Sequence, residues 1–266
     1  YIVATAETWD HVVQQFTDGS GAGRHGVLAS GVVSSGSAPG NGANIDVPFV
    51  GGGTSAKIHW PAGSIASDFT ICSITRYSGA SKKRILQGSG ANWLHGHHNA
   101  DVGVAYYNGW NLNGNANANV APNAITDWLV MCGSNGLGSP VRLNVNGVSH
   151  AVGGGTTGDI QLMINDGNVG SQASDWQLSK LYVWDSHLPD ETFAQVASEL
   201  NGYLAGDVEL SVSAATSCQA CAAGQYQDAT GQTECIACPP QSVSNVTGAA
   251  TLDVCVECEA GHIPND

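Results

Sequence analysis

Short runs of β-branched and aromatic residues alternate with glycine-, asparagine- and serine-rich segments over residues 1–208. Segments such as GGGT, NGLG and GGGTTG mark turns and loops, so each apolar run between them predicts a short strand. Many short strands predict a mainly β fold, here an antiparallel jelly-roll sandwich. The runs are residues 45–50, 69–77, 128–132, 141–145, 161–165 and 178–184.

One segment has the period of a helix instead. Around residue 200, apolar side chains recur every three or four positions, which predicts a C-terminal amphipathic helix lying on the sandwich. Pro189 is tolerated where a helix begins, and Asp190 and Glu191 suit the positive end of the helix dipole. The apolar stripe consists of Phe193, Val196, Ala197, Leu200 and Leu204.

The cysteines indicate a second, smaller module. Residues 209–216 form a linker, and residues 217–266 combine many cysteines with almost no large apolar side chains. Such a segment cannot fold by burial alone, so cross-links must hold it. Disulfides are the favoured interpretation, and a zinc ribbon, which also uses C-x2-C pairs, is the alternative. The cysteines expected in disulfides are Cys72, Cys132, Cys218, Cys221, Cys235, Cys238, Cys255 and Cys258.

Composition and charge narrow the function. Charged residues make up 11% of the chain, and 8 Lys and Arg face 22 Asp and Glu, a net charge of −14. A chain this acidic lacks the basic surface that binds nucleic acid or anionic lipid. No apolar run reaches about 18 residues, so no membrane span is expected. The first residue, Tyr1, and the Asn-Val-Thr sequon at Asn245 predict a processed extracellular glycoprotein.

The stretch NWLHGHHNADVGVAYYNGW, residues 92–110, is rich in histidine and aromatic residues. Residues 92–97 and 102–107 predict two paired strands, on which every second side chain shares a face. Three interpretations stay open: a transition-metal site formed by His95, His97 and Asp101, a glycan-binding face, or a purely structural strand pair. The predicted glycan-binding residues are Trp93, His95, His97, Tyr106, Tyr107 and Trp110.

Catalysis is not expected. Glycoside hydrolysis needs two carboxylates about 5–9.5 Å apart. The glutamates of the jelly roll are Glu7, Glu191 and Glu199, and the latter two belong to the predicted helix. The aspartates are not paired at strand spacing, and the sequence has no G-x-S-x-G motif. We therefore expect that the protein is not an enzyme.

Three stretches resemble the laminin-G/pentraxin branch of the concanavalin A-like jelly rolls. They are DGSGAGRHG (18–26), DFTICSITRY (68–77) followed by WLVMCGSN (128–135), and GSQASDWQLSKLYVWDSHLPDE (170–191). Together they span most of residues 1–208. The resemblance implies a disulfide between Cys72 and Cys132, since one bridge joins the corresponding strands of pentraxins.

Pentraxins bind ligands through calcium, so the resemblance also implies a test for that ion. The matching loop here is INDGNVGSQASD (164–175), which is shorter and lacks the family's glutamates. Calcium takes six to eight oxygen ligands, so this loop predicts weak binding at most. The predicted calcium ligands are Asp166, Asn168, Gln172 and Asp175, of which Gln172 falls on a family ligand position.

The tail resembles ephrin-receptor-like, TNF-receptor-like and EGF-like cysteine repeats, through C-x2-C, Gly-Gln-Tyr and C-x2-C-Pro. A final C-x2-C-x2-Gly looks like the start of another repeat, which implies a longer parent protein. Six cysteines allow fifteen connectivities. The favoured pairing joins the first to the third and the second to the fourth, and leaves Cys255 and Cys258 for partners downstream.

Two functional classes remain. The order of modules is similar to surface proteins of algae and other protists, including flagellar-hair (mastigoneme) subunits. The low charge content favours a structural or adhesion protein, because it resembles the composition of interfaces. Such a subunit of a surface filament or coat would contact copies of itself or other extracellular matrix proteins. The alternative is a lectin-like module that binds glycans, with calcium as an aid.

Overall fold

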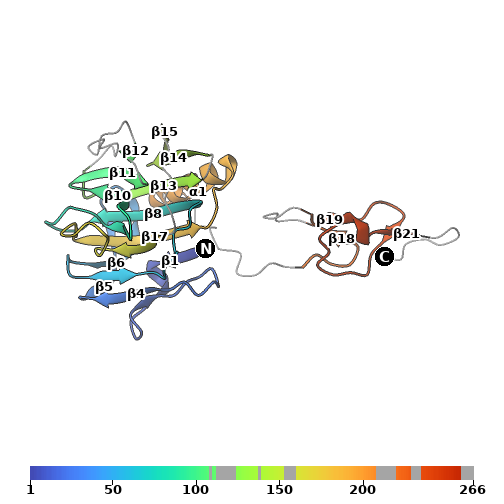
Figure 1. Ribbon diagram of the computed structural model, residues 1–266, viewed down its shortest axis with the longest axis horizontal. Coiled ribbons are helices and arrows are strands. Elements are labelled where there is room, and N and C mark those ends of the chain that lie inside the picture. Colours follow the sequence, from blue (N-terminus) through green and yellow to red (C-terminus); the bar gives the residue numbers. More distant parts are fainter. Residues whose placement is uncertain are drawn as a thin grey trace. The chain divides into compact units, whose positions relative to one another are not determined.

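The chain forms two compact units, residues 1–214 and 215–266, and their boundary falls within the predicted linker. A computed structural model (Figure 1) describes residues 1–107, 110–111, 124–136, 139–152, 160–207, 220–228 and 235–258. As the sequence predicts, the chain is mainly β, with antiparallel sheets and one α-helix among these residues.

The first unit contains two antiparallel sheets, which we call sheet A and sheet B. Figure 1 shows the central strands of sheet A side by side. The predicted runs at 45–50, 69–77, 128–132, 141–145, 161–165 and 178–184 all coincide with strands of these sheets. In spatial order sheet A consists of β15 (Val148–Val152), β14 (Ser139–Val145), β13 (Leu129–Gly136), β8 (Phe69–Tyr77), β17 (Trp176–Trp184), β6 (Ala43–Gly52) and β5 (Val33–Gly40), with β1 (Ile2–Thr5) also paired to β17.

Sheet B carries the aromatic and histidine-rich stretch. Its strands β10 and β11 form the predicted hairpin, and the turn between them has positive φ angles at Asn99 and Ala100, as a tight hairpin turn requires. In spatial order sheet B consists of β12 (Trp110–Asn111), β11 (Asp101–Tyr107), β10 (Trp93–His98), β9 (Leu86–Ser89), β16 (Gln161–Ile164), β7 (Lys57–His59), β4 (Gly26–Ser30), β3 (Gln15–Phe16) and β2 (Trp9–Asp10).

The main hydrophobic core lies between the two sheets. Side chains alternate along each strand, so every second residue enters this layer. Trp60, Trp93 and Trp176 are fully buried in it. Phe16 stacks on Trp60 with 6.0 Å between the ring centroids. These large rings hold the two sheets at a fixed separation.

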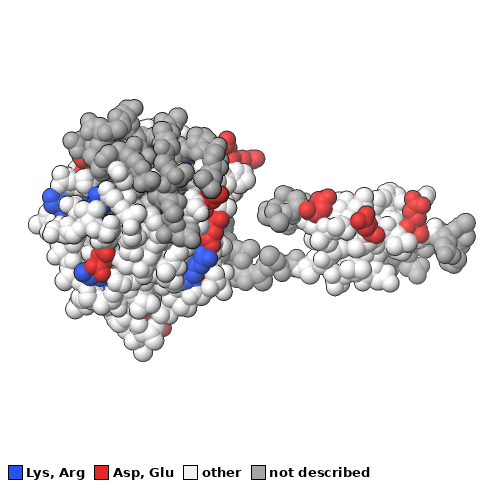
Figure 2. All heavy atoms as spheres, viewed as in Figure 1, with Lys and Arg blue, Asp and Glu red and all other residues white. Residues whose placement is uncertain are grey.

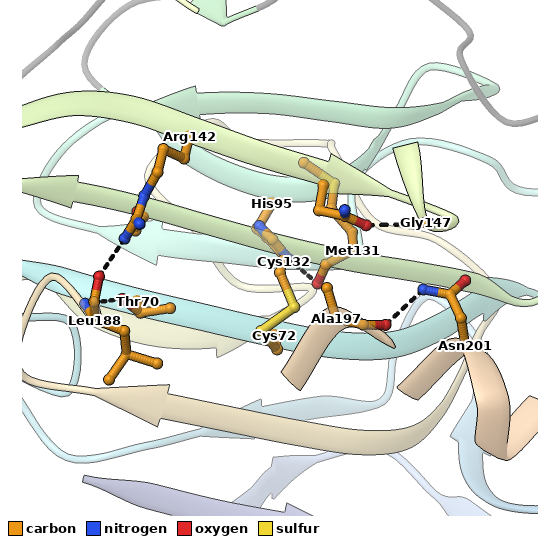
Figure 3. The surroundings of a disulfide bond; sticks show 12 residues. Thr70, Cys72, His95, Met131, Cys132, Arg142, Gly147, Leu188, Ala197 and Asn201 are labelled. Carbon is orange, nitrogen blue, oxygen red and sulfur yellow. Dashed lines mark hydrogen bonds between the residues drawn. A yellow bond between two sulfur atoms is a disulfide. The ribbon is translucent and has the colours of Figure 1, made fainter. Parts of the chain in front are cut away.

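A second core lies on the other face of sheet A, under the predicted helix. The helix α1 (Asp190–Ala205) contacts β6, β8 and β13 and buries the predicted stripe of Phe193, Val196, Ala197, Leu200 and Leu204. It ends at Gly206, whose φ of 80° is the left-handed cap that glycine adopts readily. Cys72 and Cys132 lie opposite each other on β8 and β13 and are joined by the disulfide that the resemblance implied. Figure 3 shows this bridge with Ala197 and Asn201 of α1 beside it.

The second unit is held by disulfides. It contains two short sheets, β18 (Gln225–Tyr226) with β19 (Ile236–Ala237) and β20 (Ser242–Val243) with β21 (Val256–Glu257). The second unit also contains a short 3-10 helix, η2 (Leu252–Val254), and the first unit contains another, η1 (Ala6–Thr8).

The tail disulfides differ from the favoured pairing. The bridges are Cys221–Cys235 and Cys238–Cys255, so the prediction of first-to-third and second-to-fourth pairing is wrong. The β18–β19 hairpin brings residues 221 and 235 together, and β20–β21 brings 238 and 255 together. Four cysteines are therefore bridged and are not thiolate ligands of zinc. Cys258 forms no disulfide with a described cysteine, and Cys218 lies outside the described residues.

Candidate functional site

Four of the six residues predicted to form a glycan-binding face lie inside the sandwich instead. Trp93, His95, His97 and Tyr107 are each 0% exposed. Residues 93, 95 and 97 share one face of β10, as predicted, but this face points toward sheet A. The glycan-face interpretation is therefore wrong for these four residues, because their side chains form the core.

His95 is hydrogen-bonded in the core, whereas neither ring nitrogen of His97 has a hydrogen-bond partner among the described residues. His95 Nε2–H donates to the Met131 carbonyl at 3.2 Å, so His95 Nδ1 accepts from the Tyr107 hydroxyl at 2.5 Å. His97 packs against the Tyr77 ring with 4.6 Å between centroids. Burial lowers the pKa of His95 to about 4 and, with the nearby charge of His95, that of His97 to about 3.

A transition-metal site does not form from these residues. Asp101 pairs with His98 on the outer face of sheet B, whereas His95 and His97 lie on the inner face. Within the described part of the chain, no group of three or more His, Cys, Asp or Glu side chains could hold a metal ion. The structural interpretation of the two histidines is the one that the geometry supports.

The outer face of sheet B carries one continuous row of cross-strand neighbours, which we call the cross-sheet row. Residues directly opposite each other in paired strands point to the same face. From β3 to β11 the row consists of Gln15, Val27, His59, Met163, Gln87, Leu94 and Tyr106. Trp110 continues it in the backbone register, although its side chain lies outside the described residues. Of the predicted glycan-binding residues with a described side chain, Tyr106 alone lies on this face, half-buried.

The loop of residues 165–174 lies over the middle of the row. A Cβ atom at Gly167 would lie 2.5 Å from the Gln87 Cβ, so the loop backbone rests directly on Gln87. The Asn168 N–H also donates to the Gly88 carbonyl at 2.8 Å. The exposed fractions along the row are 43% for Val27, 7% for Met163, 1% for Gln87 and 0% for Leu94. The row therefore has an open end on β4 and β7 and a covered end on β9 and β10.

Asn165 fixes this loop. Its Oδ1 accepts from the Ser174 N–H at 2.9 Å, and its Nδ2 donates to the carbonyls of Gly53, Ala56 and Ser174. Its φ of 61° lies in the left-handed region, where asparagine is tolerated better than most residues. The loop is thus tied to both ends of its own sequence and to the 53–56 turn.

Polar atoms left unsatisfied gather at the covered end of the row. The Gln172 carbonyl accepts from Gln87 Nε2 at 2.8 Å and from the Arg84 N–H at 3.2 Å. Within the described residues, Gln87 Oε1, Gln172 Oε1 and Arg84 Nε are buried and have no hydrogen-bond partner. Leaving one such group unpaired costs about 1–3 kcal/mol, so three together require an explanation.

Arg84 lies next to the half-buried Tyr106. The Arg84 side chain is 4% exposed, and its Nη1 donates to Asn92 Oδ1 at 2.7 Å. Burial lowers the pKa of the Arg84 guanidinium, and the nearby Tyr106 hydroxyl acts in the opposite direction. The guanidinium therefore lies close enough to Tyr106, a residue of the outer face of sheet B, for the two groups to interact electrostatically.

Arg84 ends a run of three basic residues. Lys82 Nζ donates to the Gly79 carbonyl at 2.7 Å, and Lys83 Nζ donates to Asn99 Oδ1 at 2.6 Å. None of the ion pairs formed by the described residues involves residues 82–84. Burial, and then the charges of residues 84 and 83, lowers the pKa of His98. Most of the described surface on the face that Figure 2 presents belongs to uncharged residues, and the run of residues 82–84 holds three of the eight Lys and Arg residues of the chain.

Three of the four predicted calcium ligands lie in the 165–174 loop, and their contacts do not favour a calcium site. Asp166 accepts from Lys57 Nζ at 2.5 Å and lies 2.8 Å from His59 Nε2, so its carboxylate is already paired. Asn168 is exposed, and Gln172 is held through its backbone. Calcium needs six to eight oxygens, and these residues do not fit that requirement.

Asp175, the fourth predicted calcium ligand, lies in a separate open pocket of about 420 Å³. Its Oδ2 accepts from the Ser81 N–H at 2.9 Å. A Cβ at Gly79 would lie 2.5 Å from the same oxygen, so glycine is required there. The pocket is lined by Val32, Val33, Ser34, Gly51, Gly52, Gly53, Ser78, Gly79, Asp175, Trp176 and Gln177. One carboxylate among serines and glycines does not make a cation site.

Sequence reasoning missed Arg84, Gln87 and Asn92. The signal that was available is the run Lys-Lys-Arg at 82–84, since these are three of the eight Lys and Arg residues of the whole chain. The sequon residue Asn245 is exposed, as a glycosylation acceptor must be. None of the described helices is long and apolar enough to cross a membrane.

Comparison with known proteins gives a family for the tail and a fold for the sandwich. Residues 209–255 match the family described as tyrosine-protein kinase ephrin type A/B receptor-like. No curated protein sequence matches the chain significantly. Three disulfides, in a chain with this tail, indicate a secreted or extracellular protein.

Among solved structures, the chain is similar to domain 4 of AbnA, an extracellular arabinanase from Geobacillus stearothermophilus solved in complex with arabinotriose. The TM-score is 0.50 at 12% identity, over 74% of this chain and 100% of that domain. A receptor binding domain of botulinum neurotoxin C/D mosaic serotype gives 0.46 at 12% identity, over 74% of this chain and 50% of that one. Trypanosoma rangeli sialidase gives 0.45 at 12% identity, over 78% of this chain and 33% of that one. The first of these likenesses shows a shared β-sandwich fold.

Proposed function

We propose that the sandwich is a non-catalytic glycan-binding module of an extracellular, cell-surface protein. The binding surface is the covered end of the cross-sheet row, between the 165–174 loop and Tyr106. The observation that carries the proposal is the pair of buried acceptors, Gln87 Oε1 and Gln172 Oε1, which lack donors among the described residues. Both atoms are shielded from solvent, so binding requires a local movement of the 165–174 loop, after which saccharide hydroxyls supply the missing donors.

Tyr106 adds an aromatic surface to these acceptors. Gln87 and Tyr106 both lie opposite Leu94, one on each neighbouring strand, so they are about 10 Å apart across the sheet. A tyrosine ring offers an apolar face to a sugar and a hydroxyl for hydrogen bonding. The arabinanase domain with the same fold was solved with an arabinose trisaccharide, which supports saccharide binding as a role for this sandwich.

The carboxylates of the first unit support a non-catalytic role. Glu7 is paired with Lys180 Nζ at 2.5 Å. Glu191 and Glu199 lie on α1, which covers sheet A and not sheet B. A glycosidase needs two carboxylates across one bond, and none of these three glutamates lies on the outer face of sheet B.

Titration calorimetry of the full chain tests the proposal, with saccharides first selected on a glycan array. Gln87→Ala and Tyr106→Ala should each weaken binding of a selected saccharide about 10-fold, since each removes a contact of about 1–1.5 kcal/mol. Tyr203→Ala, on the helix that covers sheet A, is the matched control and should bind as the natural chain does. A chain that binds no saccharide, or two site variants with unchanged affinity, would contradict the proposal.

A second candidate function is a structural subunit of a filament or coat, including a flagellar hair. Val12 and Val32 are 91% and 82% exposed, which favours contact with another protein surface. The repeat-like tail supports the same role, because tandem modules of this kind stack with their neighbours. Electron microscopy of the isolated protein separates the two: regular fibres favour the subunit, and dispersed particles favour the binding module.

A further inference from the structure

The covered end of the cross-sheet row contains a buried cation without a counter-ion. Within the described residues, the Arg84 side chain makes one hydrogen bond, to the neutral amide of Asn92, and no ion pair. Arginine is almost never fully buried unless it is paired. Arg84 is 4% exposed, and its Nε is among the buried atoms without a partner. An anion from outside the chain would supply the missing partner.

The buried Arg84 is unusual in a chain with a net charge of −14. The chain carries 22 acidic residues against 8 basic ones, yet Arg84 follows two further lysines and forms no ion pair with an acidic residue that the structure describes. Asp101 of β11 does not take part in any of the ion pairs formed by the described residues. An electropositive point on an acidic protein is a site for an anion and for little else.

We propose that the saccharide bound at this surface carries a carboxylate, as uronic and sialic acids do, and that Arg84 binds this group. The inference rests on the proposed glycan-binding function and deepens it. The guanidinium offers Nε–H and its remaining amino protons in a planar fork that matches a carboxylate. The hydroxyls of the same sugar donate to Gln87 Oε1 and Gln172 Oε1. One acidic sugar thus provides partners for all three groups, and its carboxylate also neutralises the charge of Arg84, which a neutral sugar does not.

The experiment compares three probes by titration calorimetry: an oligogalacturonate, its fully methyl-esterified neutral form, and a sulfated neutral oligosaccharide. The natural chain should bind the acid at least 10-fold more tightly than the ester. Arg84→Gln should weaken binding of the acid about 10- to 100-fold and leave the ester within about 2-fold, since hydrogen bonds to charged groups contribute about 1.5–3 kcal/mol. Arg76→Gln is the matched control, because Arg76 lies on sheet A, paired with Gln177, and should change nothing.

A second variant, Asn92→Asp, tests the role of Arg84 even if Arg84→Gln does not fold. It places a carboxylate where Arg84 Nη1 already donates, at unchanged size, so the variant should fold and compete internally with the ligand. Its preference for the acid over the ester should fall at least 10-fold, with a melting temperature equal to or above that of the natural chain.

The outcomes separate the two proposals. Equal affinity for acid and ester, equally weakened in Gln87→Ala, would overturn the role of Arg84 and leave glycan binding intact. Loss of the acid preference in Lys82→Gln/Lys83→Gln but not in Arg84→Gln would likewise overturn it in favour of a diffuse basic rim. Tighter binding of the sulfated probe than of the oligogalacturonate would overturn the proposal that the bound group is a carboxylate. No binding of any saccharide, on the array or here, would overturn the proposed function itself.

Discussion

His97 shows how one residue position reverses a functional interpretation. The alternation along residues 92–97 correctly places Trp93, His95 and His97 on one face. Which face turns inward depends on the strands that lie opposite, and the sequence does not specify them. The side chains of Trp93, His95 and His97 are buried in the core. Gln87 and Tyr106 lie on the outer face of sheet B instead. The sequence predicts which side chains share a face of the strand, but it does not predict which face is turned toward the core.

The buried histidines make stability depend on pH. The folded-state pKa values of His97 and His95, about 3 and about 4, lie below the unfolded value of about 6.5. The unfolded chain therefore takes up protons first as the pH falls, so stability is full above about pH 7 and is lost from about pH 6.5 down to about pH 4 through His95 and about pH 3 through His97. At pH 5 each histidine removes about 2 kcal/mol from the free energy of unfolding.

Urea unfolding of the natural chain and of His97→Phe at pH 7.5 and pH 5 measures this effect. Phenylalanine keeps the ring that packs on Tyr77 and cannot bind a proton, so the loss of stability at pH 5 should be smaller by about 2 kcal/mol. An identical pH dependence in the two proteins would show that His97 titrates normally when folded.

At the scale of elements, the helix was the most predictable part. Its stripe, its first turn and its position on the sandwich follow from a 3.6-residue period, and the structure confirms them. The strands were found from their apolar runs, but strand neighbours such as β9 and β16 come from sequence positions more than seventy residues apart. Such pairings cannot be derived from local patterns, so the cross-sheet row could not be predicted.

Leu200 tests the packing of α1 on sheet A. It is 0% exposed and belongs to the core that contains Cys72, Cys132 and Val130. Leu200→Ala should lower the free energy of unfolding by about 2–4 kcal/mol through lost contacts and a cavity. Gln195→Ala, on the exposed side of the same helix, should stay within about 0.5 kcal/mol. Chemical denaturation that shows equal effects for both variants would mean that the helix does not pack as described.

At the scale of the whole molecule, the change of composition near residue 208 predicts two units. The number of cysteines predicts that disulfides hold the second unit. The disulfide connectivity could not be read from spacing, since Cys221 had several partners at similar separation. The hairpin of β18 and β19 decides it, and that hairpin is too short to be recognised in the sequence.

The two units should respond differently to reductant. Cys72 and Cys132 are 0% exposed, whereas Cys235, Cys238 and Cys255 are partly exposed. A thiolate must reach a sulfur to reduce it, so limited reduction of the folded chain should open the tail bridges first. Alkylation and mass spectrometry at successive times measure the order, and the melting temperature of the sandwich should not change while its own bridge is intact. Equal rates for all three bridges would contradict the protected position of Cys72 and Cys132.

The Cys72–Cys132 bridge also determines how the sandwich would carry mechanical tension. A pulling force applied along the backbone passes from one sulfur to the other and bypasses the chain between them. The two cysteines are 60 residues apart in the sequence, and the segment between them would be roughly 200 Å long when extended. This segment carries none of the applied force while the disulfide is intact. It includes β9, β10 and β11, with Arg84, Gln87 and Tyr106. A surface protein tethered on one side and loaded on the other would therefore hold its proposed ligand on strands that the load does not stretch.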